Sequence, residues 1–250
     1  MGSAFIGKGK VRVAMYSAGT TFENRPFDFV ENCSNFQFGF AEQEAKLPDY
    51  TNASGGVDAS VKRITDTPGS MDLRHFTASN LALALWGTTA ALSAVAIVDE
   101  AGYKIVPNRF VPTKRLINTS VAPVVKKGAT VVDVADYTVS AGGITIASSI
   151  STAGVVSGDA ITIAYTPLAG ADVQGLLSTA PEVSIIVEGI NEVTGKFSSF
   201  KAYKAKLGVA QGVSLIGDDF GTLTVTFSLQ KDETITTPGK SQYFEMQQAD

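Results

Sequence analysis

The chain has 250 residues, of which 44% are hydrophobic and 18% charged, and its 20 basic and 24 acidic side chains give a formal net charge of −4. This length permits a large core, and the composition excludes a disordered tail, a collagen-like repeat and a polybasic nucleic-acid-binding protein. One cysteine, Cys33, and one histidine, His75, exclude an internal disulfide framework and any site built from several of either residue. We expect His75 to be an ordinary strand residue.

The N-terminal segment, residues 1–21, has no apolar run of about 7–15 residues, so we expect no secretory signal and a cytoplasmic protein. Residues 76–98 contain no charge and are long enough to cross a bilayer. Polar residues and Gly87 interrupt this stretch, and its longest purely apolar run is residues 81–86. We therefore expect no membrane span.

Alternation of apolar with polar positions, rich in β-branched and aromatic residues, predicts strands through most of the chain. The expected strands cover residues 11–17, 35–40, 57–64, 70–76, 103–110, 183–188, 197–207 and 222–229. In the second of these, Phe36, Phe38 and Phe40 share one face, which we expect in the core. In the last, Leu223, Val225, Phe227 and Leu229 face one way, and Thr222, Thr224, Thr226 and Ser228 face the other.

One short helix is expected between these strands. Thr77 suits the N-cap position before residues 78–86, and Gly87 is placed to end the helix in a left-handed conformation. Leu81, Leu85 and Trp86 then share a face that would pack on the sheet.

The polar, turn-rich segment 41–56 lies between two expected strands and includes Pro48, Tyr50, Gly55 and Gly56. A loop of this length within a compact domain is usually functional or disordered, and its aromatic and proline content favours a contact with a partner.

The middle of the chain, residues 119–168, is rich in Val, Ile and Thr and poor in charge, which predicts a β-meander. Its expected strands are residues 129–134, 137–139, 144–147 and 160–166, with turns at 142–143 and 158–159. We interpret it as a module inserted into a main domain formed by residues 1–118 and 169–250.

Residues that suggest catalysis or ligand binding are few. Gly7-Lys8-Gly9-Lys10 lacks the spacing of a phosphate-binding loop. Carboxylate pairs occur at Asp218-Asp219, at Asp232-Glu233 and at Glu42 with Glu44, but nothing in the sequence fixes their separation. We expect solvated turn charges here, and no enzyme activity, cofactor or metal.

The order of these features resembles that of the major tail tube proteins of long, non-contractile-tailed bacteriophages. The resemblance covers nearly the whole chain and rests on loose motifs: "LPDY" at 47–50 followed by Gly55-Gly56, "NLALALWG" at 80–87 and "VEGIN" at 187–191. It implies a mainly β fold of β-sandwich type with one flanking helix. It also implies rings of six copies that stack into a tube in the virion tail, assembled in the host cytoplasm.

The same resemblance implies roles for several segments. The 41–56 loop would bridge subunits or rings, with Pro48, Tyr50, Gly55 and Gly56 at the matching positions, and the 119–168 module would lie on the tube exterior as decoration or clamp. The partners implied are other copies of the chain, a tape measure protein and terminator or baseplate proteins, while DNA transits without specific binding. We expect the Thr222, Thr224, Thr226 and Ser228 row to face the lumen or an interface.

Two other functions remain open from the residues alone. A carbohydrate-binding adhesin or receptor-binding module would also be all-β, and Tyr16, Tyr50, Tyr103 and Trp86 are its candidate stacking residues. A glycoside hydrolase on a β scaffold would need two carboxylates facing across one cleft.

Overall fold

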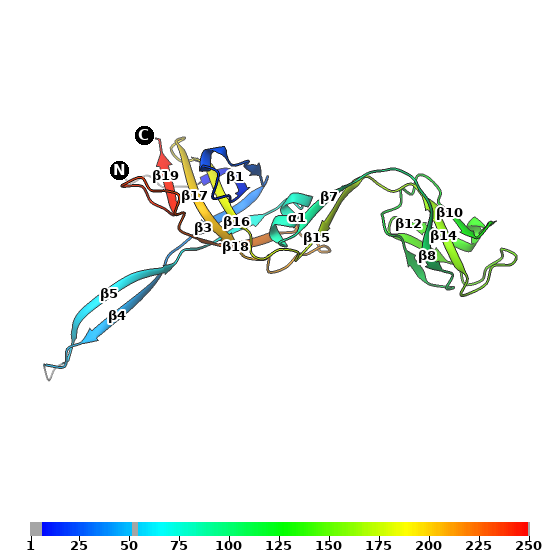
Figure 1. The fold of residues 1–250 in the computed structure, drawn as a ribbon, viewed down its shortest axis with the longest axis horizontal. Coiled ribbons are helices and arrows are strands. Elements are labelled where there is room, and N and C mark those ends of the chain that lie inside the picture. Colours follow the sequence, from blue (N-terminus) through cyan, green and yellow to red (C-terminus); the bar gives the residue numbers. More distant parts are fainter. Residues whose placement is uncertain (1–6, 52–54, 250) are drawn as a thin grey trace. The chain divides into compact units, whose positions relative to one another are not determined.

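The computed structural model describes residues 7–51 and 55–249. It confirms the mainly β fold class, with 19 strands, one α-helix and two 3-10 helices, η1 (Phe22–Asn24) and η2 (Val134–Asp136), in these residues. The chain divides into two compact units: Met1–Thr89 with Val173–Asp250, and Ala90–Asp172. The boundaries fall in β7 (Thr88–Leu92) and β15 (Gly170–Gln174), which pair with each other (Figure 1).

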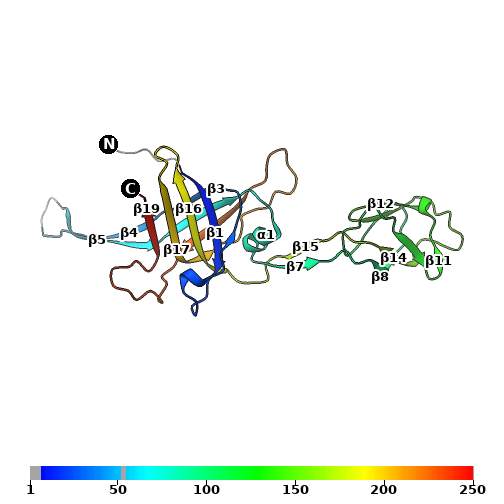
Figure 2. The same cartoon turned by 90° about the horizontal axis from the view of Figure 1, so that it is seen from above.

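The first unit is built on one 8-stranded antiparallel sheet in the order β2-β1-β16-β17-β18-β6-β3, with β19 also paired to β17. The strands are β1 (Gly7–Met15), β2 (Asp28–Phe29), β3 (Cys33–Phe38), β6 (Pro68–Leu73), β16 (Glu182–Asn191), β17 (Phe197–Leu207), β18 (Leu223–Leu229) and β19 (Phe244–Gln248). The expected strands 197–207 and 222–229 therefore match β17 and β18 closely. Figure 2 shows the sheet from above, with β1, β3, β16, β17 and β19 labelled.

This sheet curls so that its concave face encloses the core. The rings of Phe38 and Phe200 lie 4.7 Å apart, although β18 and β6 separate their strands in the sheet order. Phe36 stacks on Phe227 at 5.4 Å, as expected of core residues. Phe40, expected beside them, is 53% exposed, because β3 ends at Phe38 and the chain turns into the next strand.

The single helix, α1 (Ala78–Ala84), covers the core of this sheet. The Thr77 hydroxyl accepts a hydrogen bond from the Asn80 amide at 3.2 Å, which confirms the expected N-cap. The side chains that pack on the core are Leu81, Leu83 and Ala84, so the expected contacts of Leu85 and Trp86 were wrong.

The helix also ends differently from the prediction. Trp86, not Gly87, adopts the left-handed conformation, with φ +53°. Gly87 is required for another reason: a Cβ at this position would overlap the carbonyl oxygen of Gln174.

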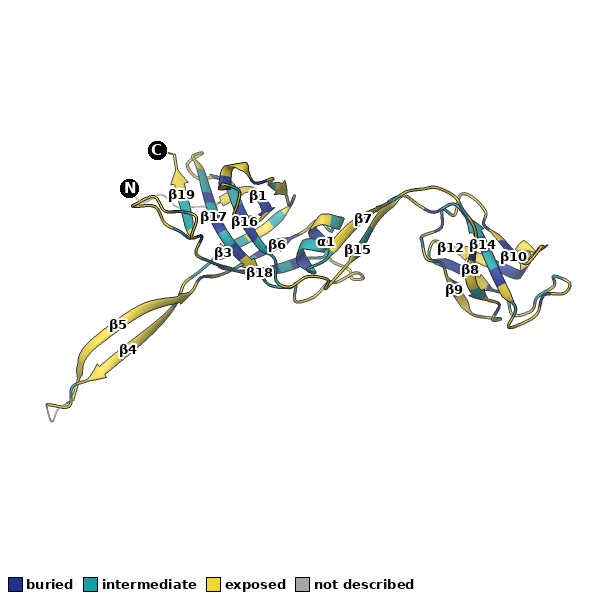
Figure 3. Cartoon of the chain, viewed as in Figure 1, coloured by how far each residue is buried: buried dark blue, intermediate teal, exposed yellow. Residues whose placement is uncertain are grey.

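A two-stranded sheet, β4 (Ala41–Pro48) and β5 (Val57–Asp66), leaves the main sheet between β3 and β6. The predicted loop over 41–56 was therefore wrong for residues 41–48, which form a strand paired in register with β5. The polar composition of this strand, typical of a loop, reflects exposure on both faces (Figure 3). Residues 52–54 of the expected loop lie outside the described residues.

The second unit contains two sheets, ordered β11-β10-β14-β8 and β12-β13-β9. Its strands are β8 (Ile97–Lys104), β9 (Phe110–Pro112), β10 (Val124–Lys127), β11 (Thr130–Val131), β12 (Tyr137–Ser140), β13 (Gly143–Ile146) and β14 (Ala160–Tyr165). Ile105, Ile117, Val125, Ile144 and Ile163 are fully buried at its core.

The boundaries expected for this insertion, 119–168, differ from the observed Ala90–Asp172. The difference arises because β8 and β9, expected in the main domain, pair with β14 and β13 of the module. The single strand expected over residues 103–110 was also wrong, since a turn separates β8 from β9.

Candidate assembly surfaces

The chemistry-bearing side chains do not converge on one centre. Within residues 7–51 and 55–249, no group of three or more His, Cys, Asp and Glu residues is placed to hold a metal ion. His75, expected in a strand, follows the end of β6, and its Nδ1 contacts the Glu31 carboxylate. No helix in the described part of the chain is long and apolar enough to cross a membrane.

The three carboxylate pairs lie in different settings. Glu42 and Glu44 are on the β4–β5 hairpin, and Asp218-Asp219 are in an exposed loop. Asp232 is buried, whereas the Glu233 side chain is 85% exposed. Burial raises the pKa of Asp232, but hydrogen bonds from Thr234, Tyr16 and Arg25 outweigh it and leave the pKa below its ordinary value.

Of the expected stacking residues, Tyr50 is 84% exposed, whereas Tyr16, Tyr103 and Trp86 are half-buried. The Tyr16 hydroxyl donates to Asp232 at 3.0 Å. The Tyr103 hydroxyl is buried, and burial together with Glu100 raises its pKa to about 12. The Trp86 indole nitrogen is also buried. The adhesin hypothesis therefore retains one of its four aromatic residues.

The β4–β5 hairpin is an amphipathic ribbon. Because cross-strand partners share a face, Ala45 with Val61 and Leu47 with Ala59 form an apolar row. The opposite face has Glu44 with Lys62 and Lys46 with Ser60. Nearer the main sheet, Gln43 with Arg63 follows on the first face and Glu42 with Ile64 on the second, so the two faces differ only in the half of the hairpin near its tip. All ten residues of β5 are exposed, and both Leu47 and Val61 are 52% exposed (Figure 3).

The loop residues expected at a subunit junction gather at the tip of this hairpin. Pro48 ends β4, and the Asp49 amide donates to the Gly56 carbonyl at 2.9 Å across the tip. Gly55 and Gly56 have φ +65° and +152°, a region that favours glycine, which explains their use here. Pro48, Tyr50, Gly55 and Gly56 are thus brought together.

The row of hydroxyl residues along β18 lies on the convex face of the main sheet. Leu223, Val225, Phe227 and Leu229 are buried and the alternate positions half-buried, as the alternation predicted. Thr224 donates to Asp72 at 2.6 Å, Ser228 donates to Asp66, and Thr222, just before β18, accepts from Arg74.

This polar row extends across two further strands that the sequence reasoning did not include. In register, Asp72 lies between Thr224 and Asn35, and Ser70 lies between Thr226 and Gln37. Gln37 donates to Ser70 at 3.1 Å. The alternation of polar residues in β3 and β6 is the signal that would have identified them.

Three strands of the main sheet have a strand partner on one side only within the described residues, and β19, which pairs with β17 alone, is one of them. β3 pairs with β6 alone, and β2 pairs with β1 alone. The two residues of β2 pair with Arg12 and Val13 of β1, and the Val30 amide donates to the Val11 carbonyl at 3.2 Å, so Gly7–Lys10 have no strand on that side within the described part of the chain. Such edges pair with other chains unless they are protected.

The model of one protein family, described as protein of unknown function UCP028589, matches residues 4–247. No curated protein matches the chain.

Proposed function

The chain belongs to the family described as protein of unknown function UCP028589, and we propose that it is the structural subunit of a phage tail tube. In this proposal identical copies form rings, six by the resemblance, that stack around a hollow axis and conduct DNA. The observation that carries it is the β4–β5 hairpin, whose apolar row of Ala45, Leu47, Ala59 and Val61 is exposed along both strands.

An exposed ribbon of this kind needs a partner, because an isolated two-stranded hairpin is only marginally stable in water. Its apolar row would become buried against a neighbouring copy. The open edges of β3 and β1 support the same proposal, since pairing between copies would satisfy their backbone groups and close the ring.

The polar row on β18 would face the lumen. Its hydroxyl groups bond to Asp66, Asp72 and Arg74, and Lys206 lies opposite Ser228 in register, so two acidic groups balance two basic groups along this row. A wall with few free cations would let DNA pass without the counterion release that drives binding. The chain's net charge of −4 agrees with this role.

The second unit would lie on the tube exterior, as decoration or as a clamp between subunits. Removal of residues 93–169, with β7 and β15 kept and joined by a short turn, distinguishes these roles. Normal tubes from the shortened chain would support decoration, and failure to form rings would support the clamp. Tape measure, terminator and baseplate proteins would be the other partners.

Electron microscopy of Val61→Asp and Ser60→Asp variants tests the proposal. The two substitutions add the same charge to adjacent residues on opposite faces of the same strand. The proposal expects hollow rings or tubes from the unmodified chain and from Ser60→Asp, and their loss in Val61→Asp. Isolated monomers or trimers of the unmodified chain at high concentration would contradict it.

A further inference from the structure

The loop between β17 and β18, residues 208–222, presents three large apolar side chains to solvent. Leu215 is 81% exposed, Ile216 96% and Phe220 95%. Single exposed apolar residues are common on proteins, but three within six residues, each almost fully exposed, form a cluster that normally marks a contact site. Asp218 and Asp219 lie between them, and neither forms an ion pair within the described residues.

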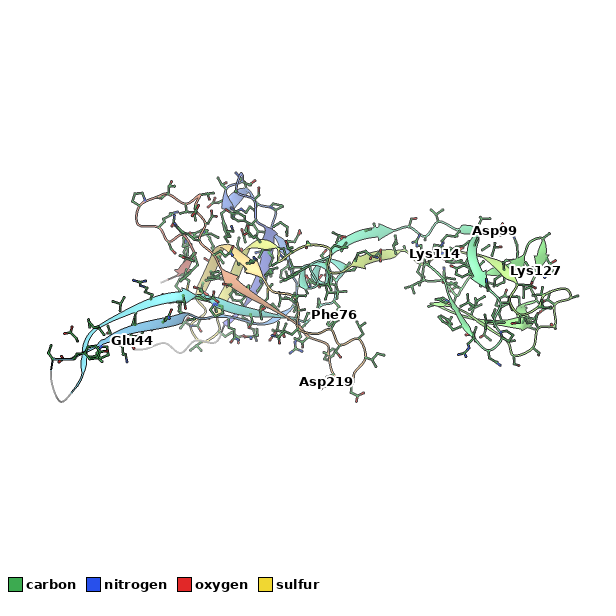
Figure 4. The ribbon with its side chains drawn as sticks, turned by 60° about the horizontal axis from the view of Figure 1, so that its bottom comes forward. Glu44, Phe76, Asp99, Lys114, Lys127 and Asp219 are labelled. Carbon is green, nitrogen blue, oxygen red and sulfur yellow. The ribbon has the colours of Figure 1, made fainter. Side chains whose placement is uncertain are left out.

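The base of this loop is fixed to the first unit. The Ala210 amide donates to the Ala84 carbonyl of α1 at 2.8 Å, and Val213 packs against the core. At the other end, Gly221 lies so close to the Phe76 ring that a Cβ would contact it at 2.7 Å. Figure 4 shows the loop with Asp219, and Phe76 near its base. The exposed tip, residues 214–220, is therefore held in place by both of its ends.

A groove of about 680 Å³ lies at the other end of β17. Its lining includes two neighbouring cross-strand rows, one of Lys8, Ile190 and Phe197 and the next of Lys10 and Glu188. Phe197 is 69% exposed, so the groove combines apolar surface with lysines.

The charges of the groove and the loop are complementary. Lys8 pairs with Glu192 at 2.7 Å, and Glu188 pairs with Arg12. Lys10, opposite Glu188 in register, then has no ion pair of its own within the described part of the chain. The three basic residues Lys8, Lys10 and Arg12 therefore exceed the two acidic residues by one positive charge. The loop tip has apolar side chains to match Phe197 and two unpaired carboxylates to match Lys10.

We propose that the tip of the 208–222 loop of one copy inserts into the groove of a second copy, so that copies join head to tail along β17. This inference rests on the proposed function and gives the contact between stacked rings. The loop and the groove lie at opposite ends of the same strand and are different surfaces. Their contact is therefore heterologous, and each added copy offers a free loop or a free groove for the next.

Two variants of the full chain test the contact. The loop variant is Leu215→Ser with Ile216→Ser and Phe220→Ser. The groove variant is Lys10→Glu with Phe197→Asp, whose new charges would repel Asp218 and Asp219. Val95→Ser with Val98→Ser is the matched control, because these side chains are 71% and 75% exposed in the other unit. Circular dichroism checks that every variant is folded.

Association is measured by sedimentation velocity and electron microscopy. Each variant alone should lose stacking by more than about tenfold, the loss expected when an interface anchor is removed, while the control stacks normally. A mixture of the two variants should form pairs that do not grow, because the intact loop of one fits the intact groove of the other.

Other outcomes overturn the inference. Stacking of the groove variant at the normal level would mean that loops bind each other or another surface. Stacking of the loop variant at the normal level would mean that the loop does not form the contact. Tubes in which the loop and the groove of neighbouring copies lie apart would also overturn the inference but leave the proposed function in place. Conversely, head-to-tail chains without hollow rings would support this contact and contradict the tail tube.

Discussion

The guanidinium of Arg25 and the carboxylate of Asp232 form a buried ion pair, with Nη2 and Oδ2 3.4 Å apart and side chains only 1% and 2% exposed. Arg25 also donates to the Ser184 hydroxyl at 2.6 Å and to the Tyr203 carbonyl at 2.9 Å. The pair therefore fixes two segments from opposite ends of the chain onto β16 and β17 of the main sheet.

Asp232→Asn should destabilise the first unit. The substitution leaves the buried Arg25 charge without its counter-ion, and breaking a buried pair in this way costs about 3–5 kcal/mol. Denaturant unfolding measures the loss. Glu233→Gln is the control, because this side chain is exposed and lies 3.9 Å from Lys231, and it should change the free energy of unfolding by less than about 0.5 kcal/mol.

The pH dependence of the same carboxylate has a definite sign. The folded pKa of Asp232 lies below its ordinary value of 3.8, so the stability that it contributes is present above that pH. This contribution is lost as the pH falls through the lowered pKa. Asp232→Asn should therefore show a smaller decrease of Tm on acidification than the unmodified chain, and equal decreases would contradict the assignment.

Asp136 should stabilise the second unit in a similar way. Its carboxylate accepts hydrogen bonds from the amide and hydroxyl groups of both Ser151 and Thr152, at 2.5–2.9 Å. The hydroxyl of Thr152 and the amide of Ser151 contribute most to lowering its pKa to about 2. We expect its stabilisation to be complete above about pH 4 and to disappear as the pH falls to about 2.

Calorimetry of Asp136→Asn measures this effect. The Tm of the transition that belongs to residues 90–172 should fall at pH 7. Asp99→Asn removes one exposed carboxylate from the same unit and should leave this Tm nearly unchanged. If this transition has the same Tm in both variants and in the unmodified chain, the Asp136 contacts do not stabilise the unit.

Gly87→Ala should destabilise the region beyond α1, because the new methyl group would overlap the Gln174 carbonyl. Overpacking of this kind costs roughly 1–3 kcal/mol. Gly39→Ala is the matched control, since no atom lies within 4 Å of a Cβ at that position. Thermal unfolding compares the two variants, and an equal change of Tm in both would contradict the contact as the cause.

Strand positions could be predicted from sequence where alternation was strong. Phe197–Leu207 and Leu223–Leu229 alternate over many residues with one buried face, and β17 and β18 match these expectations. In residues 41–48, buried and exposed positions do not alternate, because both faces of the strand are exposed. Their polar composition therefore indicated a loop instead. Only the pairing of these residues with β5, further along the chain, identifies them as one strand of a hairpin.

The candidate surfaces were only partly predictable for the same reason. The β18 row was found from its own alternation, but Asp72 and Gln37 join it through pairing between distant strands, which local patterns do not encode. The apolar tip at Leu215, Ile216 and Phe220 has no periodicity, so only its exposure in the fold identifies it.

The most direct test of the tail tube proposal is a cryo-electron microscopy reconstruction of the assembled full chain. The account predicts a hollow tube in which strands pair across copies at the open edges of β3 and β1. It also predicts that Thr222, Thr224, Thr226 and Ser228 line the central channel. Particles whose sheets end within each copy, or tubes with this row on the outer wall, would contradict it.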